Sequence, residues 1–322
     1  MNLGVSTKYI KKILKYFHIF TSKVFKMNNY LFYICLIFLT QSCQKKTKNC
    51  NCLITSSKDI SSKSSNFPFI ELSEIKYTSD TLNITGFIAK PKHMEPNQKF
   101  PLIIFNRGGN KDYGVITKSN VQYLEYLSSL GYVVMASQYR GNSYSEGTDE
   151  FGGKDLNDVK CLIEIAKSKP YIDTNNIGVL GYSRGGMMAY LLSKNFDEIK
   201  TLITVGAPTD LLLGSKNRPE LYNQVLNKLI GDSISIREEF IKRSPLYWFD
   251  QLNEPMLIIH GSDDKKVNIE HSKRLMDSLE KSPNKITPFF VEGGNHSLSN
   301  YRQTRNDTIA SWFHYYLKGN KN

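Results

Sequence analysis

A serine between two glycines is the part of this chain best suited to chemistry. The segment 181–185 reads Gly-Tyr-Ser-Arg-Gly and directly follows the apolar run 177–180. This is the G-x-S-x-G pattern of a sharp strand-to-helix turn that exposes a nucleophilic serine. Such a turn strains the backbone at the serine, so residues without a Cβ are needed two positions before and after it. The pattern predicts that Ser183 is a nucleophile held between Gly181 and Gly185.

A serine hydroxyl becomes a good nucleophile only when a histidine removes its proton and a carboxylate orients that histidine. With this kind of turn, the order along the chain is serine, acid, histidine. Asp264 follows the apolar run 256–259, and His296 follows the run 288–291. Because the carboxyl ends of parallel strands meet at one edge of a sheet, we expect Asp264 as the orienting acid and His296 as the base, both near Ser183.

Other residues compete for both roles. Asp263 is the rival acid, and its alternative role is to bond backbone amides within a turn. The rival histidines lie in helical patterns, before the sheet or just ahead of the acid; they are His93, His260, His271 and His314. His296 alone follows the last apolar run in a glycine-rich loop, so the sequence favours Asp264 and His296.

Acyl transfer places negative charge on a carbonyl oxygen, which backbone N–H groups must stabilise. The first expected donor is the amide of Arg184, directly after the nucleophile. The second is expected in the loop after the run 102–105, from Arg107 or else from Gly108. The alternative for this loop is an ordinary strand-to-helix turn. The side chains of Arg107 and Arg184 would either bind a substrate carboxylate or lie on the solvated surface.

Short apolar runs alternate with helical patterns after Pro101, which predicts an α/β fold with a mostly parallel, doubly wound sheet. Two antiparallel strands are expected before it, at 75–78 and 82–89. The later strands are expected at 102–105, 132–136, 177–180, 202–205, 256–259 and 288–291. Helices are expected at 119–130, 155–167, 183–194, 269–279 and 304–317. Residues 208–253 interrupt the alternation and predict a short helical excursion over the site.

The charge of the chain is unevenly distributed. Its 322 residues carry a net charge of +12, but residues 1–52 hold nine lysines and no acidic residue. Removing those nine positive charges leaves +3, so nucleic acid is not an expected partner. Basic residues, an apolar run at 30–39 and Ser42-Cys43 are typical of a signal peptide. The end of this segment resembles the lipobox of bacterial lipoproteins, although Thr40 stands where that motif usually has leucine.

Three regions follow from this pattern: a leader and signal peptide at 1–43, a flexible tether at 44–66 and a catalytic domain at 67–322. We expect a bacterial cell-envelope protein anchored to a membrane by lipid on Cys43, with a secreted or periplasmic protein as the alternative. The five cysteines do not suggest a disulfide framework. Cys50 and Cys52 lack the second pair of a metal site, and Cys161 is expected to be a small core residue.

Together these residues resemble the catalytic domain of the prolyl oligopeptidase family of serine peptidases, within the α/β-hydrolase superfamily. The resemblance covers about residues 67–317 and rests on the segments 139–143, 147, 155–158, 181–185, 243–246 and 260–267. In that family the aspartate three positions before the valine of the last segment is the triad acid, which implies Asp264. The chain departs at 106–109, where relatives often carry His-Gly-Gly or a tyrosine, and it has no room for the family's β-propeller.

The resemblance implies an α/β-hydrolase fold and a serine hydrolase, with peptide cleavage expected first. The first alternative is a carboxylic ester hydrolase like the dienelactone hydrolases, which share the architecture. The second is an inactive hydrolase fold that serves as a binding module. The expected partners are a peptide or ester substrate and a membrane reached through Cys43. No cofactor and no metal are expected.

Overall fold

The computed structural model describes residues 52–61, 66–231, 236–280 and 286–319. The predicted leader at 1–43, including Cys43, lies outside the described residues, and so does most of the predicted tether. Among the residues that are described, no helix is both long and apolar enough to cross a membrane.

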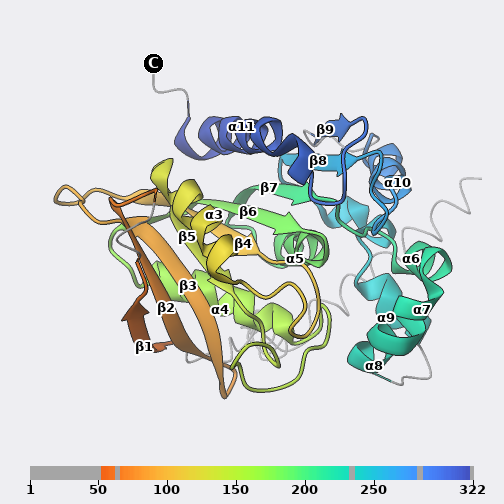
Figure 1. Cartoon of the computed structure of the whole chain (residues 1–322), viewed down its shortest axis with the longest axis horizontal. Helices are drawn as coiled ribbons and strands as arrows, with labels where there is room; N and C mark the ends of the chain where they lie inside the picture. The colour runs from red at the N-terminus through yellow and green to blue at the C-terminus, as the bar shows by residue number, and fades with distance from the viewer. Residues whose placement is uncertain (1–51, 62–65, 232–235, 281–285, 320–322) are drawn as a thin grey trace, which may run out of the picture. The chain divides into compact units, whose positions relative to one another are not determined.

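The described chain is organised by one sheet of nine strands in the order β1-β2-β3-β5-β4-β6-β7-β8-β9 (Figure 1). Strands β1 to β3 are antiparallel and join β5 in antiparallel fashion, whereas β5, β4 and β6 to β9 are mutually parallel. The bounds are β1 Ile54–Asp59, β2 Ile70–Ser79, β3 Leu82–Pro91, β4 Phe100–Asn106, β5 Val133–Ser137, β6 Ile172–Tyr182, β7 Ile199–Val205, β8 Met256–Gly261 and β9 Ile286–Val291. The predicted mostly parallel sheet with antiparallel N-terminal strands is confirmed.

Helices cover both faces of the sheet, because most strands between β2 and β8 present apolar side chains to both sides. Helices α3 and α11 pack on one face, where Leu124 and Phe313 join the core. Helices α4, α5 and α10 pack on the other, with Leu162, Met188 and Leu275. Their bounds are α3 Lys118–Ser129, α4 Asp155–Lys167, α5 Arg184–Ser193, α10 Glu270–Leu279 and α11 Arg302–Phe313. This doubly wound arrangement also confirms the prediction.

The predicted helical excursion between β7 and β8 is present. It consists of short helices, at one side of the sheet in Figure 1. Their bounds are α6 Leu211–Asn217, α7 Pro219–Leu221, α8 Asn227–Ile230 and α9 Ile236–Lys242, with a π turn at Tyr222–Leu226.

The predicted tether differs from the structure in the part that is described. Residues Ile54–Asp59 form β1, an edge strand whose residues pair with β2 from Tyr77 to Ser73. Every residue of β1 after Ile54 is exposed. An edge strand that is solvated on both faces is held mainly by backbone hydrogen bonds, so it gives no apolar alternation in the sequence. That is why the pattern of this segment suggested a flexible chain.

The prediction that the cysteines form no disulfide was wrong. Cys52, just before β1, is bonded to Cys161 of α4, 109 residues later. Cys161 is 2% exposed, so its predicted place in the core is correct but its chemical state is not. Only the tertiary packing of α4 against the start of the sheet brings these two sulfur atoms together. The disulfide therefore fastens the N-terminal edge strand to the core.

Candidate active site

Ser183 lies at the turn between β6 and α5, in the strained conformation that the glycine spacing predicted. Its backbone angles are φ 54° and ψ −123°, a region that non-glycine residues rarely adopt. A Cβ on Gly181 would overlap the carbonyl oxygen of Gly185, and a Cβ on Gly185 would overlap that of Asn106. The turn can therefore form only with glycines at these positions.

The loop after β4 lies beside this turn because β4 and β6 are neighbouring parallel strands. Their register pairs Asn106 with Gly181, so the residues after Asn106 run next to Ser183. A Cβ on Gly108 would lie 3.2 Å from the Cβ of Ser183. The structure thus brings the Arg107-Gly108 backbone to the side of Ser183, as expected for this loop.

Asp264 and His296 are in direct contact. Asp264 follows β8, His296 follows β9, and the Nδ1 atom of His296 lies 2.7 Å from Oδ2 of Asp264. The rival Asp263 is exposed, and its side chain accepts a hydrogen bond from Ser262. The choice of Asp264 over Asp263 as the partner of His296 therefore agrees with the geometry.

The carboxylate of Asp264 has further donors that the sequence analysis missed. Its Oδ1 accepts the backbone N–H groups of Lys266 and Val267 at 2.8 and 2.9 Å. The Nε2 atom of His260 lies 3.2 Å from Oδ2 of Asp264. Burial raises the pKa of Asp264, but the hydrogen bonds from His260, His296 and the Val267 amide outweigh it and hold that pKa well below its usual range. Asp264 is thus ionised at neutral pH.

The neighbours of His260 show which of its ring nitrogens donates toward Asp264. Its Nε2 atom lies 2.8 Å from the carbonyl oxygen of Val267, which can only accept a hydrogen bond. Nε2 must therefore carry a proton, and Nδ1 is hydrogen-bonded to the hydroxyl of Ser272 at 2.7 Å. The sequence placed His260 merely ahead of the acid, whereas the structure makes it a second partner of Asp264.

Among the described residues, the other rival histidines form no hydrogen bond with Asp264 or His296. His93 and His314 are exposed. His271 is buried on α10, and its Nδ1 atom lies 3.2 Å from the backbone nitrogens of both Thr209 and Asp210. Burial lowers the pKa of His271 to about 4.

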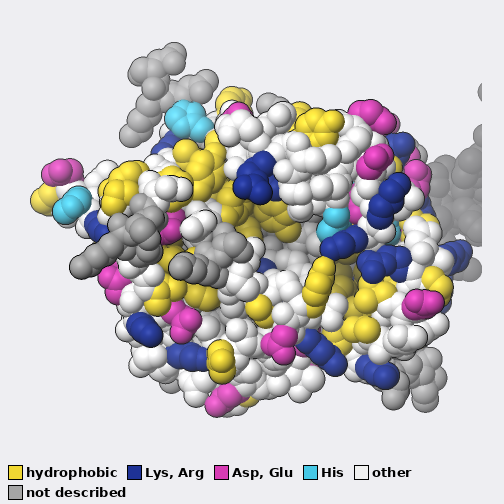
Figure 2. Space-filling view, in the orientation of Figure 1, with side chains coloured by type: hydrophobic (Ala, Val, Ile, Leu, Met, Phe, Trp, Pro, Cys, Tyr) yellow, Lys and Arg dark blue, Asp and Glu magenta, His cyan; other side chains and the backbone are white. Residues whose placement is uncertain are grey.

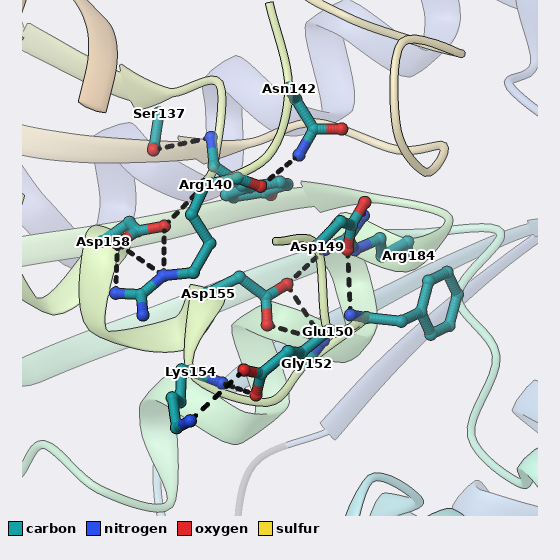
Figure 3. A network of polar contacts seen from close by, with 12 residues as sticks. Ser137, Arg140, Asn142, Asp149, Glu150, Gly152, Lys154, Asp155, Asp158 and Arg184 are labelled. Carbon is teal, nitrogen blue, oxygen red and sulfur yellow. Dashed lines mark hydrogen bonds and ion pairs between the residues drawn. The ribbon is translucent and has the colours of Figure 1, made fainter. Parts of the chain in front are cut away.

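Neither alternative for the Arg184 side chain was correct. Arg184 is 1% exposed and forms ion pairs with Asp149, at 2.7 Å, and with Asp155. Figure 3 shows both aspartates pointing toward Arg184, with Asp155 also bonded to the backbone of Gly152. Burial lowers the pKa of Arg184, but the two carboxylates more than compensate and raise it. The guanidinium is thus neutralised within the protein.

The side chain of Arg107 is also buried rather than solvated. Its Nη2 atom donates to the carbonyl oxygen of Gln138 at 2.8 Å, and Nη1 donates to that of Gly108 at 2.9 Å. The hydroxyl of Tyr139 donates to the carbonyl oxygen of Arg107 at 3.1 Å. Burial lowers the pKa of Arg107 to about 10. These bonds hold the loop after β4 from both sides.

A cleft of about 1040 Å³ is lined by both Ser183 and His296. Its walls come from the loop after β4, from α3, from the excursion and from the start of α11, with apolar groups such as Tyr123, Leu221 and Tyr222. This volume lies at the upper end of the range found for ligand-binding clefts, about 300 to 1,000 Å³. No group of three His, Cys, Asp or Glu side chains that could hold a metal ion occurs in the described parts of the chain.

The model of the prolyl oligopeptidase family matches residues 117–320, more than half of the chain. The chain is 31% identical to a Bacillus subtilis protein named uncharacterized peptidase YtmA, over 66% of this chain and 80% of that protein. It is 28% identical to the uncharacterized peptidase YuxL of the same organism, over 76% of this chain but only 39% of the relative.

Among solved structures, the Pyrococcus horikoshii acylaminoacyl peptidase has the same fold. The TM-score is 0.69 at 24% identity, over 79% of this chain and 43% of that one. The chain thus spans most of YtmA but about two fifths of these two longer relatives. The family match and the relatives named as peptidases agree with the turn at Ser183 and the Asp264–His296 contact. This chain belongs to the prolyl oligopeptidase family of serine peptidases.

Proposed function

We propose that Ser183 is the nucleophile of this peptidase, with His296 as general base and Asp264 as the carboxylate that orients it. The observation that carries the proposal is the 2.7 Å contact between Nδ1 of His296 and Oδ2 of Asp264, beside a strained Ser183 in the same cleft. An ionised Asp264 accepts a hydrogen bond from the Nδ1–H group of His296. The unprotonated Nε2 of His296 is then available to take the proton of Ser183.

In the reaction, the Oγ atom of Ser183 attacks the peptide carbonyl while Nε2 of His296 takes its proton. The backbone N–H of Arg184 and that of Arg107 or Gly108 donate to the resulting oxyanion. His296 then gives its proton to the departing amine, so the C–N bond breaks and an acyl-enzyme remains. In the second half, His296 takes a proton from water as the water oxygen attacks the acyl carbonyl. The bond between the acyl carbon and Oγ then breaks, the acid leaves, and His296 returns the proton to Oγ of Ser183.

The test combines active-site labelling with a matched pair of substrates. A fluorophosphonate should label the folded wild type at Ser183 and leave Ser183→Ala unlabelled. An N-acetylated peptide amide and the ester with the same acyl group should both be cleaved by the wild type. Absence of labelling in folded protein would overturn the enzyme assignment in favour of a binding module. Ester cleavage without amide cleavage would replace peptidase by esterase activity.

We also propose that the protein is exported and anchored to a membrane of the cell envelope by lipid on Cys43. The disulfide between Cys52 and Cys161 supports an oxidising compartment, because disulfides persist mainly outside the cytosol. Growth with radiolabelled palmitate should label the wild type, and the Cys43→Ser variant should carry no label. Unlabelled wild type found in the culture medium or periplasm would support secretion and contradict the anchor.

A further inference from the structure

All the charged side chains that line the cleft are cationic. Among the described residues that form its walls there are six arginines and lysines and no aspartate or glutamate. In Figure 2 basic side chains gather beside a hollow near the centre of the face shown. The six are Arg107, Arg184, Arg218, Lys266, Arg302 and Arg305.

The first two are here called the inner arginines (Arg107 and Arg184). Both are bonded to other groups of the protein. Arg184 is neutralised by Asp149 and Asp155. Arg107 donates to the backbone carbonyls of Gln138 and Gly108. The charge of Arg184 is thus compensated by two carboxylates, whereas Arg107, which has no ion pair in the described chain, uses all five of its N–H groups on backbone carbonyls. Neither side chain is free to bind a ligand.

The remaining four, here called the outer cations (Arg218, Lys266, Arg302 and Arg305), differ in this respect. None of them forms an ion pair with a carboxylate in the part of the chain that the structure describes. Arg218 donates to the carbonyl oxygen of Lys266 at 3.3 Å, and Lys266 donates to the hydroxyl of Tyr113 at 2.9 Å. Their partners are thus uncharged.

Arg305 is the most informative outer cation because it is only 8% exposed. Its Nη1 donates to the carbonyl oxygen of Ser297 at 2.6 Å, and both Nε and Nη2 donate to the side-chain oxygen of Asn306 at 3.1 and 2.8 Å. A guanidinium has five N–H groups, and these bonds use three of them. Two N–H groups of Arg305 thus remain for a ligand, unlike those of Arg107, which all donate to backbone carbonyls. A bound anion would also offset the cost of burying the charge of Arg305.

Arg305 contacts the residues next in sequence to both reacting side chains, Ser183 and His296. Its guanidinium carbon lies 5.5 Å from the centre of the Tyr182 ring, and Tyr182 directly precedes Ser183. Its bond to Ser297 joins it to the residue that directly follows His296. Arg302 lies one turn earlier on α11 and lines the same cleft. A group bound at Arg305 would therefore belong to a substrate of Ser183.

We propose that the cleft selects peptides that carry a carboxylate, and that Arg305, assisted by the other outer cations, is the residue that binds it. The carboxylate comes either from an acidic side chain or from the carboxyl terminus of a short peptide. A free amino terminus finds no carboxylate among the described lining residues, so the amino end of the substrate is blocked or lies outside the cleft. This inference rests on the proposed function of Ser183.

The test uses two matched pairs of N-acetylated peptides cleaved by the full chain. One pair differs only in a free or amidated carboxyl terminus, and the other, amidated in both members, differs only in Glu or Gln. We expect kcat/KM to favour the carboxylate by about tenfold or more in at least one pair, as for a charge-assisted hydrogen bond. The pair that responds identifies the source of the carboxylate. This preference should decrease as salt is added.

The Arg305→Gln variant should reduce the preference to about one, while kcat on the neutral peptides changes much less. Arg302→Gln and Lys266→Gln, whose side chains bond neither Ser297 nor Asn306, should each reduce the preference partly. Equal rates within both pairs in the wild type would overturn the inference. So would equal losses on charged and neutral peptides in Arg305→Gln, which would mark a residue that only positions the His296 loop.

If Ser183 is not a nucleophile at all, the same experiments give a different result. In that case the wild type would cleave no member of either pair and would not react with the fluorophosphonate. A chain that cleaves all four peptides at similar rates would keep the function of Ser183 and lose only the selectivity proposed for Arg305.

Discussion

Arg184 and the outer cations line the same cleft, but within the described chain the fold gives carboxylate partners only to Arg184. Arg184 is buried between two aspartates, whereas Arg305 is almost as buried and has only neutral partners. Internal ion pairs fix the loops around Ser183 whatever is bound. Cations without an ion pair keep their attraction for a ligand. In the proposed selectivity, the paired arginine holds the site together and the outer cations bind the carboxylate of the substrate.

The largest expected effect comes from the nucleophile, which belongs to neither group. Ser183→Ala should lower kcat by about 10⁴-fold or more, since the nucleophile is lost. It should leave both groups of cations intact, so binding of carboxylate peptides, measured by calorimetry, should persist in this variant. Loss of binding together with loss of turnover would mean that the change had disturbed the cleft itself.

The second expected effect comes from a substitution in the inner group. Arg184→Met leaves Asp149 and Asp155 buried without their cation, which should lower the free energy of unfolding by about 3 to 5 kcal/mol. Urea denaturation measures this loss. The matched control adds Asp149→Asn and Asp155→Asn to the same variant and should recover part of the stability. A single variant as stable as the wild type would contradict the role given to this ion pair.

A change far from both groups sharpens the comparison, because it alters stability without touching the cleft. Replacing Cys52 and Cys161 together by serine opens a loop of 109 residues and should lower the free energy of unfolding by about 3 to 5 kcal/mol. The preference for carboxylate peptides should stay the same. If that preference also fell, selectivity would depend on general stability rather than on the outer cations.

The smallest expected effect concerns an uncharged group on the cleft wall. His271 is neutral because burial disfavours its charged form and its Nδ1 faces two N–H donors. Its pKa is about 4 in the folded protein, against an ordinary value of 6.5. The folded protein thus resists protonation, and stability is lost as the pH falls from 6.5 toward 4.

At pH 5 this loss amounts to about 2 kcal/mol relative to pH 7.5. The His271→Asn variant keeps an acceptor for the same N–H groups but cannot take the proton. Its denaturation midpoint should therefore fall less than that of the wild type over this interval. The same pH dependence in both proteins would show that other groups are responsible.

Much of the fold and of the candidate site was accessible from the sequence alone. The run before Ser183 had to be a buried strand, and Gly181 and Gly185 had to flank a strained turn, because no other residue fits there. Asp264 and His296 each follow an apolar strand, and parallel strands in one sheet bring such positions to a common edge. These are local patterns combined with a simple rule of topology, so one sequence suffices to predict them.

The remaining features required the tertiary structure. Strand β1 gives no apolar pattern because backbone hydrogen bonds to β2 hold it at an exposed edge. The partner of Cys161 lies 109 residues away, and the partners of Arg184 lie 35 and 29 residues away. Side-chain chemistry does not reveal which arginine meets a carboxylate and which does not. That depends on distances between strand ends and helices, and only the folded chain decides it.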